Sequence, residues 1–186
     1  YQLSVEPGSA LASLMEKGAW DEAADDVCEA QYSRLCQALK SAGYHHYEIS
    51  NFALPGYEAV HNSAYWRHVP YVGLGPGAHS FLADGAMVRK WNEPDLTRYE
   101  KAMAAGDLSL VQGGETLDEE QIAIEKIMLA LRTSEGVSES YLLDKCLASK
   151  VEDALACGNL VRTGHGSIRI PEEKFFVSDG TISSIL

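Results

Sequence analysis

Residues 61 to 81, HNSAYWRHVPYVGLGPGAHSF, gather the side chains of this chain that are best suited to binding chemistry. A neutral imidazole, such as that of His61, is a ligand for haem iron or for zinc. Tyr65 and Trp66 add flat apolar rings with polar tips, and the amide of Asn62 can fix an imidazole tautomer or hold a carboxylate. Together these four residues suit an aromatic macrocycle with acidic side chains. The alternative is that His61 is a hydrogen-bonded structural residue.

The glycine-rich run GLGPGA, residues 73 to 78, has the spacing of a dinucleotide-binding fingerprint. Such a fingerprint must open a helix, whose N-terminal amides then hold a pyrophosphate. Pro76 and the strand-like sequence AHSF occur here instead, which argues against a nucleotide-binding fold. Two interpretations remain: a tight turn at a strand end, or a strand whose missing side chains let its backbone lie against a flat ligand.

The other histidines form no metal site by their spacing. Neighbours on a strand face opposite ways, so Ala78 and His79 are not expected to line the same pocket surface. The same argument excludes His45 and His46 as a metal-binding pair. Two histidines have no chemically useful neighbours and are expected at the surface: His68 and His165.

The four cysteines include no CxxC pair, which argues against a zinc or thioredoxin-type site. Cys28 and Cys36 share one face of a predicted helix with Tyr32. Buried thiols on a helix face are typical of a reducing compartment, so we expect a cytoplasmic protein.

Composition limits the function classes. The chain has 186 residues, 46 % of them hydrophobic, and can bury a core. Its formal net charge of -12 argues against general binding to nucleic acids or anionic membranes. No apolar run is long enough to span a bilayer. The chain begins at Tyr1 without an initiator Met or a signal peptide, and we interpret it as a fragment of a longer protein.

The first part of the chain reads as helices that alternate with strands. The expected elements are a strand at 1–5, helices at 9–17 and 20–43, a strand at 44–53, a loop at 54–62, a hairpin at 78–91 around Asp84-Gly85, and a helix at 93–106. Helix followed by strand suggests the closing β/α units of a parallel sheet or barrel.

A shift in composition near Gln112 predicts a domain boundary, with one domain at 1–112 and another at 113–186. Beyond it, three helices and a hairpin that turns at 164–166 form a winged-helix pattern. From residue 113 onward there are 13 Asp and Glu but only 7 Lys and Arg. DNA binding needs cations on phosphates, so packing or protein contact is the favoured role.

Several motifs, in their order along the chain, resemble those of the radical-SAM haem chaperones (HemW type), which are relatives of oxygen-independent coproporphyrinogen III oxidase. These motifs are YQLSVEPGS, YEISNFALPGYEAVHNSAYW, YVGLGPGAHSF and LRTSEG, followed by the terminal wing. The resemblance implies an α/β (α+β) fold: the last β/α units of a partial radical-SAM (β/α) barrel, then a small winged-helix-like domain. The family's CxxxCxxC loop, which holds a [4Fe–4S] cluster and S-adenosylmethionine, has no counterpart here. We therefore expect the carboxyl-terminal portion.

The resemblance also assigns residues. The family's HNxxYW motif, tied to haem binding, falls on His61, Asn62, Tyr65 and Trp66, with His61 as the candidate iron ligand. The expected S-adenosylmethionine pocket comprises Tyr1, Leu3, Gly75, Ala78 and His79. Ser9 stands where the family usually has Thr, and the hydroxyl is kept.

The function implied is that of a haem chaperone, with haem or porphyrin as ligand and a haem-acceptor protein as partner. One alternative is oxidative decarboxylation of coproporphyrinogen III, and another is a non-enzymatic winged-helix interaction module. Whether the parent is an enzyme stays open, but a fragment without the cluster loop is not expected to cleave S-adenosylmethionine. The open strand edge of a cut barrel could pair with a second copy, which would make a homodimer.

Overall fold

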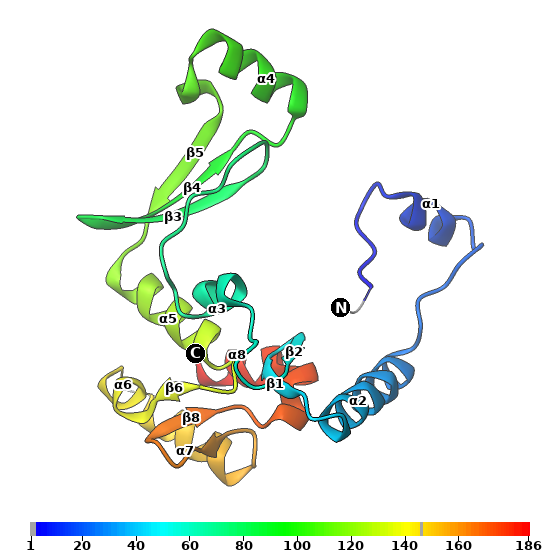
Figure 1. Cartoon of the computed structure of the whole chain (residues 1–186), viewed down its shortest axis with the longest axis vertical. Coiled ribbons are helices and arrows are strands. Elements are labelled where there is room, and N and C mark those ends of the chain that lie inside the picture. The colour runs from blue at the N-terminus through cyan, green and yellow to red at the C-terminus, as the bar shows by residue number, and fades with distance from the viewer. Residues whose placement is uncertain (1–2, 146) are drawn as a thin grey trace.

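The computed structural model describes residues 3–145 and 147–186 (Figure 1). Leu3 to Val5 are not part of a strand, which corrects that expectation for the described residues. The helix α1 (Ala10–Glu16) begins as predicted, because the Ser9 hydroxyl accepts a hydrogen bond from the Ala12 N–H at 3.1 Å. The long helix α2 (Asp25–Ser41) starts later than predicted and ends before Gly43, which is left-handed at φ +85°.

The expected strand at 44–53 is instead a hairpin of β1 (His45–Glu48) and β2 (Asn51–Ala53), paired antiparallel. The chain reverses because the Ile49 N–H donates to the Arg132 carbonyl at 3.0 Å, and the Ser50 N–H donates to the Glu48 carboxylate at 3.2 Å. Every strand pair among the described residues is antiparallel. The parallel pairing expected of closing β/α units is therefore not found within this part of the chain.

The helix α3 (Val60–Trp66) carries the HNSAYW sequence, so the loop expected at 54–62 ends three residues early. It packs against α5 (Glu119–Ala130). The start of α5 is fixed by a capping box, in which Asp118 and Gln121 each accept the other's backbone N–H. The motif thus lies on a short helix held against a longer one.

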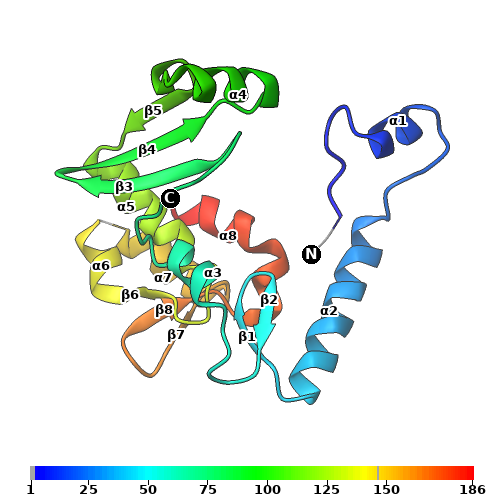
Figure 2. The same cartoon turned by 45° about the horizontal axis from the view of Figure 1, so that its top comes forward.

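A three-stranded sheet follows, in the order β3 (His79–Asp84), β4 (Ala86–Asn92) and β5 (Gln112–Thr116). The β3–β4 hairpin turns at Gly85 as predicted. The predicted helix is α4 (Leu96–Ala105), capped by Asp95 and ended by left-handed Gly106, and η1 (Leu108–Leu110) leads into β5. Figure 2 shows α4 next to this sheet, away from the rest of the molecule.

The winged-helix pattern is present. After α5 come β6 (Val137–Ser138), α6 (Glu139–Asp144), α7 (Ala148–Ala156), β7 (Val161–Arg162) and β8 (Ser167–Arg169), with strand order β6-β8-β7. Two further elements, η2 (Glu172–Val177) and α8 (Ser178–Ile185), were not predicted. Their side chains help to form a buried apolar cluster, which runs from Ile127 to Ile185 and includes Phe175 at 0 % exposure.

The domain boundary predicted at 112/113 falls inside β5, which pairs with β4 along its length. The buried residues of that cluster all follow the predicted boundary, but Tyr32 of α2 and Ile49 also pack against it, and the two domains stay a prediction. Within the described residues, no helix combines the length and the apolar character needed to cross a bilayer.

Candidate functional site

One face of α3 borders a pocket of 460 Å³. Asn62, Tyr65 and Trp66 supply this face, because residues three and four positions apart lie on the same side of a helix. The other walls come from the turn of the β1–β2 hairpin and from Leu129 of α5. Three of the four predicted haem-binding residues are therefore brought together.

Glu48, at the end of β1, is one of the residues of this pocket that the sequence did not single out. Its side chain is buried, at 1 % exposure, and one carboxylate oxygen accepts the Ser50 N–H at 3.2 Å. The other oxygen, Oε1, has no hydrogen-bond partner among the described residues. The sequence gave no clear signal for Glu48, because β1 reads HHYE and a carboxylate does not stand out beside two histidines.

His61 lies beside the pocket rather than in its wall. It is exposed, and its Nε2 is 3.0 Å from the hydroxyl of Tyr65, with the two rings edge to face at 4.8 Å. The Tyr65 ring in turn meets the edge of Tyr71 at 4.6 Å. Tyr65 therefore connects the imidazole to the pocket.

The expectation that His68 lies at the surface is wrong. Its side chain is 6 % exposed and packs on the ring of Phe81 at 4.3 Å. Its Nε2 is 3.0 Å from the carboxylate of Glu125, which also pairs with Arg89. The partners come from β3, β4 and α5, so the local sequence gave no sign of them. His68 and Tyr65 both border a second cavity of 360 Å³. His165, by contrast, is exposed on the wing as predicted.

The glycine-rich run is held against its own chain. A Cβ on Gly73 would lie 2.1 Å from the carbonyl oxygen of His79, so only glycine fits there. Gly75 is left-handed at φ +100°, and its carbonyl accepts a hydrogen bond from the Asn92 amide at 2.8 Å. These contacts support the tight-turn interpretation.

Among the described residues predicted for the S-adenosylmethionine pocket, Leu3 is not brought together with the others. Tyr1 lies outside the described residues, and Leu3 is 65 % exposed. Figures 1 and 2 both show the segment before α1 apart from β3. His79 is exposed at the start of β3, with its ring 6.1 Å from that of Trp91. The assignment of these residues to a cofactor remains a prediction.

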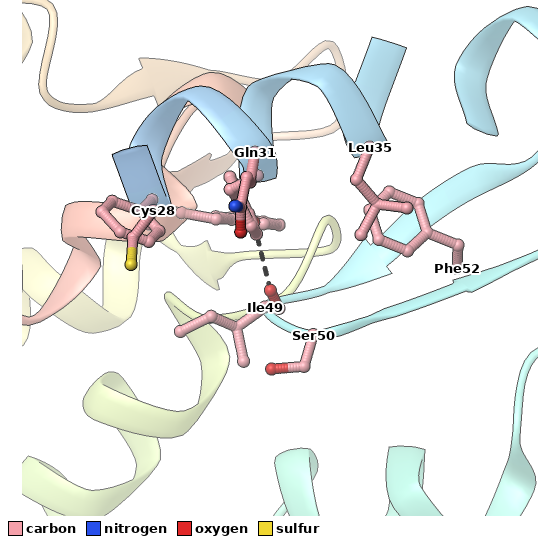
Figure 3. A pocket seen from close by; sticks show the side chains of 9 residues that line it. Cys28, Gln31, Leu35, Ile49, Ser50 and Phe52 are labelled. Atoms are coloured by element: carbon pink, nitrogen blue, oxygen red, sulfur yellow. Dashed lines mark hydrogen bonds between the residues drawn. The ribbon is translucent and has the colours of Figure 1, made fainter. Parts of the chain in front are cut away.

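A third cavity, of 320 Å³, lies between α2, the β1–β2 hairpin and η2 (Figure 3). The Tyr32 hydroxyl donates to the Ile49 carbonyl across it at 3.2 Å, and burial raises the pKa of Tyr32. Cys28 borders this cavity, and Cys36 lies two turns further along α2. Both thiols are half-buried, so the shared face was correct but full burial was not. This region joins α2 to the winged-helix part by packing.

No group of three or more His, Cys, Asp or Glu side chains capable of holding a metal occurs within the described residues. The cysteines described there, Cys28, Cys36 and Cys157, are free thiols. The cysteine spacing of the sequence contains no CxxxCxxC motif of the kind that holds a [4Fe–4S] cluster.

The fold corresponds to the carboxyl-terminal portion of a radical-SAM enzyme. The coproporphyrinogen III oxidase HemN of Escherichia coli matches with a TM-score of 0.60, over 83 % of this chain and 39 % of that chain, at 16 % identity. No protein-family model matches the sequence.

Curated relatives of known family show to which radical-SAM proteins the chain is related. The haem chaperone HemW of Mycobacterium tuberculosis is 33 % identical over 175 residues, covering 90 % of this chain and 44 % of the relative. HemW of Bacillus subtilis is 33 % identical, covering 78 % and 37 %. The mitochondrial radical S-adenosyl methionine domain-containing protein 1 of Danio rerio is 33 % identical, covering 76 % and 33 %. The chain thus belongs to the radical-SAM family of HemW-type and coproporphyrinogen-oxidase-like proteins, as its motifs indicated, and spans less than half the length of these relatives.

Proposed function

We propose that this chain is the haem-binding portion of a radical-SAM haem chaperone, which binds haem and passes it to an acceptor protein. The observation that carries this proposal is the convergence of Asn62, Tyr65 and Trp66 on one 460 Å³ pocket. Relatives named as haem chaperones support the same activity.

The pocket has the chemistry that a porphyrin needs. Its volume lies within the usual range of small-molecule sites, and two aromatic side chains offer flat surfaces for a macrocycle. His61 is next to this surface and is accessible from solvent. Iron ligation through His61 Nε2 would require its hydrogen bond with Tyr65 to open, because one lone pair cannot serve both partners.

Haem titration of this chain, followed by the Soret band, tests the proposal. We expect His61→Ala and Trp66→Ala to weaken haem binding by about tenfold or more, since each removes a group next to the pocket. His165→Ala is the matched control, because it removes an exposed imidazole on the wing and should leave the affinity unchanged. Unaltered affinity in both His61→Ala and Trp66→Ala would exclude the assigned site.

A second candidate is the oxidative decarboxylation of coproporphyrinogen III, which the fold shared with the E. coli enzyme favours. On this proposal, S-adenosylmethionine and the [4Fe–4S] cluster would be held mainly by the part of the relatives that this chain does not match. Leu3, Gly75, Ala78 and His79 would then face the cofactor, together with Tyr1. Product analysis with a reconstituted, longer protein would separate decarboxylation from haem transfer.

For the winged-helix part we propose a protein-contact role. Two of its cations are committed to neighbours: Arg162 pairs with both Glu139 and Glu152, and the Lys150 ammonium donates to the Leu186 carbonyl at 3.0 Å. Such cations are poorly placed to bind phosphates. A haem acceptor or a second copy of the chain is the proposed partner, and a cytoplasmic location is proposed from the free thiols.

A further inference from the structure

The starting point is the buried acid of the α3 pocket. Glu48 is 1 % exposed, and its Oε1 has no partner among the described residues. Burying such an oxygen removes its hydration without a replacement hydrogen bond, which lowers the stability of the fold. A purely structural role would therefore be destabilising. A residue kept at that cost beside Trp66 is a candidate for recognising a ligand.

Within the α3 pocket, no described lining residue carries a charge that compensates Glu48. The described residues that line the pocket include no Lys, Arg or His: Glu48, Ile49, Ser50, Asn51, Asn62, Tyr65, Trp66 and Leu129. A neighbouring pocket of 510 Å³ shares Glu48 and Trp66 and adds two more carboxylates, Glu58 and Glu135; its His45 has Nδ1 3.9 Å from Glu58. Its Arg67 is already paired with Glu135 through two nitrogens. The site is therefore electronegative where a flat ligand would meet Trp66.

We propose that Glu48 makes this pocket select tetrapyrrole edges that carry no carboxylate, a specificity that rests on the haem-binding function proposed above. Haem has both propionates on one edge, so its opposite edge can enter while the propionates stay outside. Coproporphyrin III has one propionate on each of its four rings, so each ring that enters brings a carboxylate toward Glu48; even at the one edge with two methyl groups, both flanking rings carry a propionate on their other side. Like charges repel, and the repulsion is stronger beside a buried carboxylate such as Glu48 than in bulk water.

This arrangement discriminates through repulsion of the wrong ligand. It also separates the two candidate functions, because a pocket that rejects coproporphyrin suits haem transfer better than decarboxylation of a four-propionate substrate. Glu48 is thus assigned as a specificity-determining residue of the site.

The test compares the dissociation constants of haem and of iron coproporphyrin III, which share the metal and the ring and differ in their carboxylates. We expect the wild-type chain to bind haem at least about tenfold more tightly. Glu48→Gln should reduce this ratio by at least about fivefold, mainly by tightening binding of iron coproporphyrin III. Glu120→Gln is the matched control: it makes the same change at an exposed position of α5 and should keep the wild-type ratio.

A second measurement needs no substitution. On the wild-type chain, the tetramethyl ester of iron coproporphyrin III should gain more affinity over its free acid than haem dimethyl ester gains over haem. The selectivity inference fails, while the haem site stands, if haem binds but two results are negative. These are an affinity ratio in Glu48→Gln equal to that of the wild type, and equal gains of affinity on esterification for the two porphyrins. If the wild-type chain binds no haem, the proposed function fails and this inference fails with it.

Discussion

Replacing Gly73 with Ala tests whether the glycine-rich run is required by packing. The added Cβ would lie 2.1 Å from the carbonyl oxygen and 2.7 Å from the carbonyl carbon of His79. Both are backbone atoms at the start of β3, so no side chain can swing aside. The backbone must move by more than 1 Å to restore an ordinary contact, since non-bonded carbon and oxygen atoms prefer roughly 3.5 Å.

That movement has a cost that can be worked out from the contacts. Gly73 N–H donates to the Ser80 hydroxyl at 2.9 Å, and Tyr71 and Phe81 exchange two backbone hydrogen bonds at 2.7 and 2.9 Å. Loss of one or two of these bonds costs about 1 kcal/mol each. Overpacking strain adds about 1–3 kcal/mol, so we expect Gly73→Ala to lower the free energy of unfolding by about 2–4 kcal/mol.

Equilibrium urea unfolding, followed by tryptophan fluorescence, measures this change. Gly164→Ala is the matched control, because a Cβ there meets nothing within 4 Å and the residue is not left-handed. It should change the unfolding free energy by less than about 0.5 kcal/mol. A Gly73→Ala chain as stable as the wild type would refute the packing argument and return the glycine run to the ligand-facing interpretation.

Two further predictions concern the ring cluster between the β1–β2 hairpin and η2. Burial lowers the pKa of His46, whose ring stacks on Phe52 at 4.0 Å. The unfolded chain then takes up a proton at higher pH than the folded one, so stability is complete above about pH 6.5 and falls as the pH drops below it. In His46→Phe this part of the pH dependence should disappear from urea unfolding curves measured between pH 7.5 and pH 5. Phe175→Ala should lower the unfolding free energy by about 3–5 kcal/mol, since Phe175 is fully buried, and a loss below about 1 kcal/mol would contradict its place in the core.

The elements that the sequence predicted correctly are those fixed by local signals. A hydroxyl at Ser9 and a carboxylate at Asp95 cap helices, and Gly85 and Gly106 take left-handed backbone at a hairpin and a helix end. Each device acts within about four residues, so its effect can be read without knowing the tertiary fold. The wing also belongs to this group, because its turn residues lie next to one another.

The features that were missed depend on contacts between distant segments. The reversal at Ile49 and Ser50 has no Gly, Pro, Asn or Asp at its centre, and it is fixed by the Arg132 carbonyl from the end of α5. The burial of His68 likewise depends on Glu125, which lies 57 residues further along the chain. Sequence patterns indicate the periodicity within one helix or strand, but they do not indicate which distant element will pack against it.

The relative positions of the candidate haem residues could have been predicted from the sequence alone. Read as a helix, the motif places Asn62, Tyr65 and Trp66 on one face, while His61 is turned by about 100° from Asn62. The structure agrees: the three line the pocket, and His61 reaches it only through the hydroxyl of Tyr65. A porphyrin that contacts both His61 and Trp66 would therefore have to span Tyr65. Replacement of Tyr65 should therefore leave iron ligation and binding of the porphyrin ring independent of each other. Loss of His61 should affect only iron ligation, and loss of Trp66 should affect only binding of the ring.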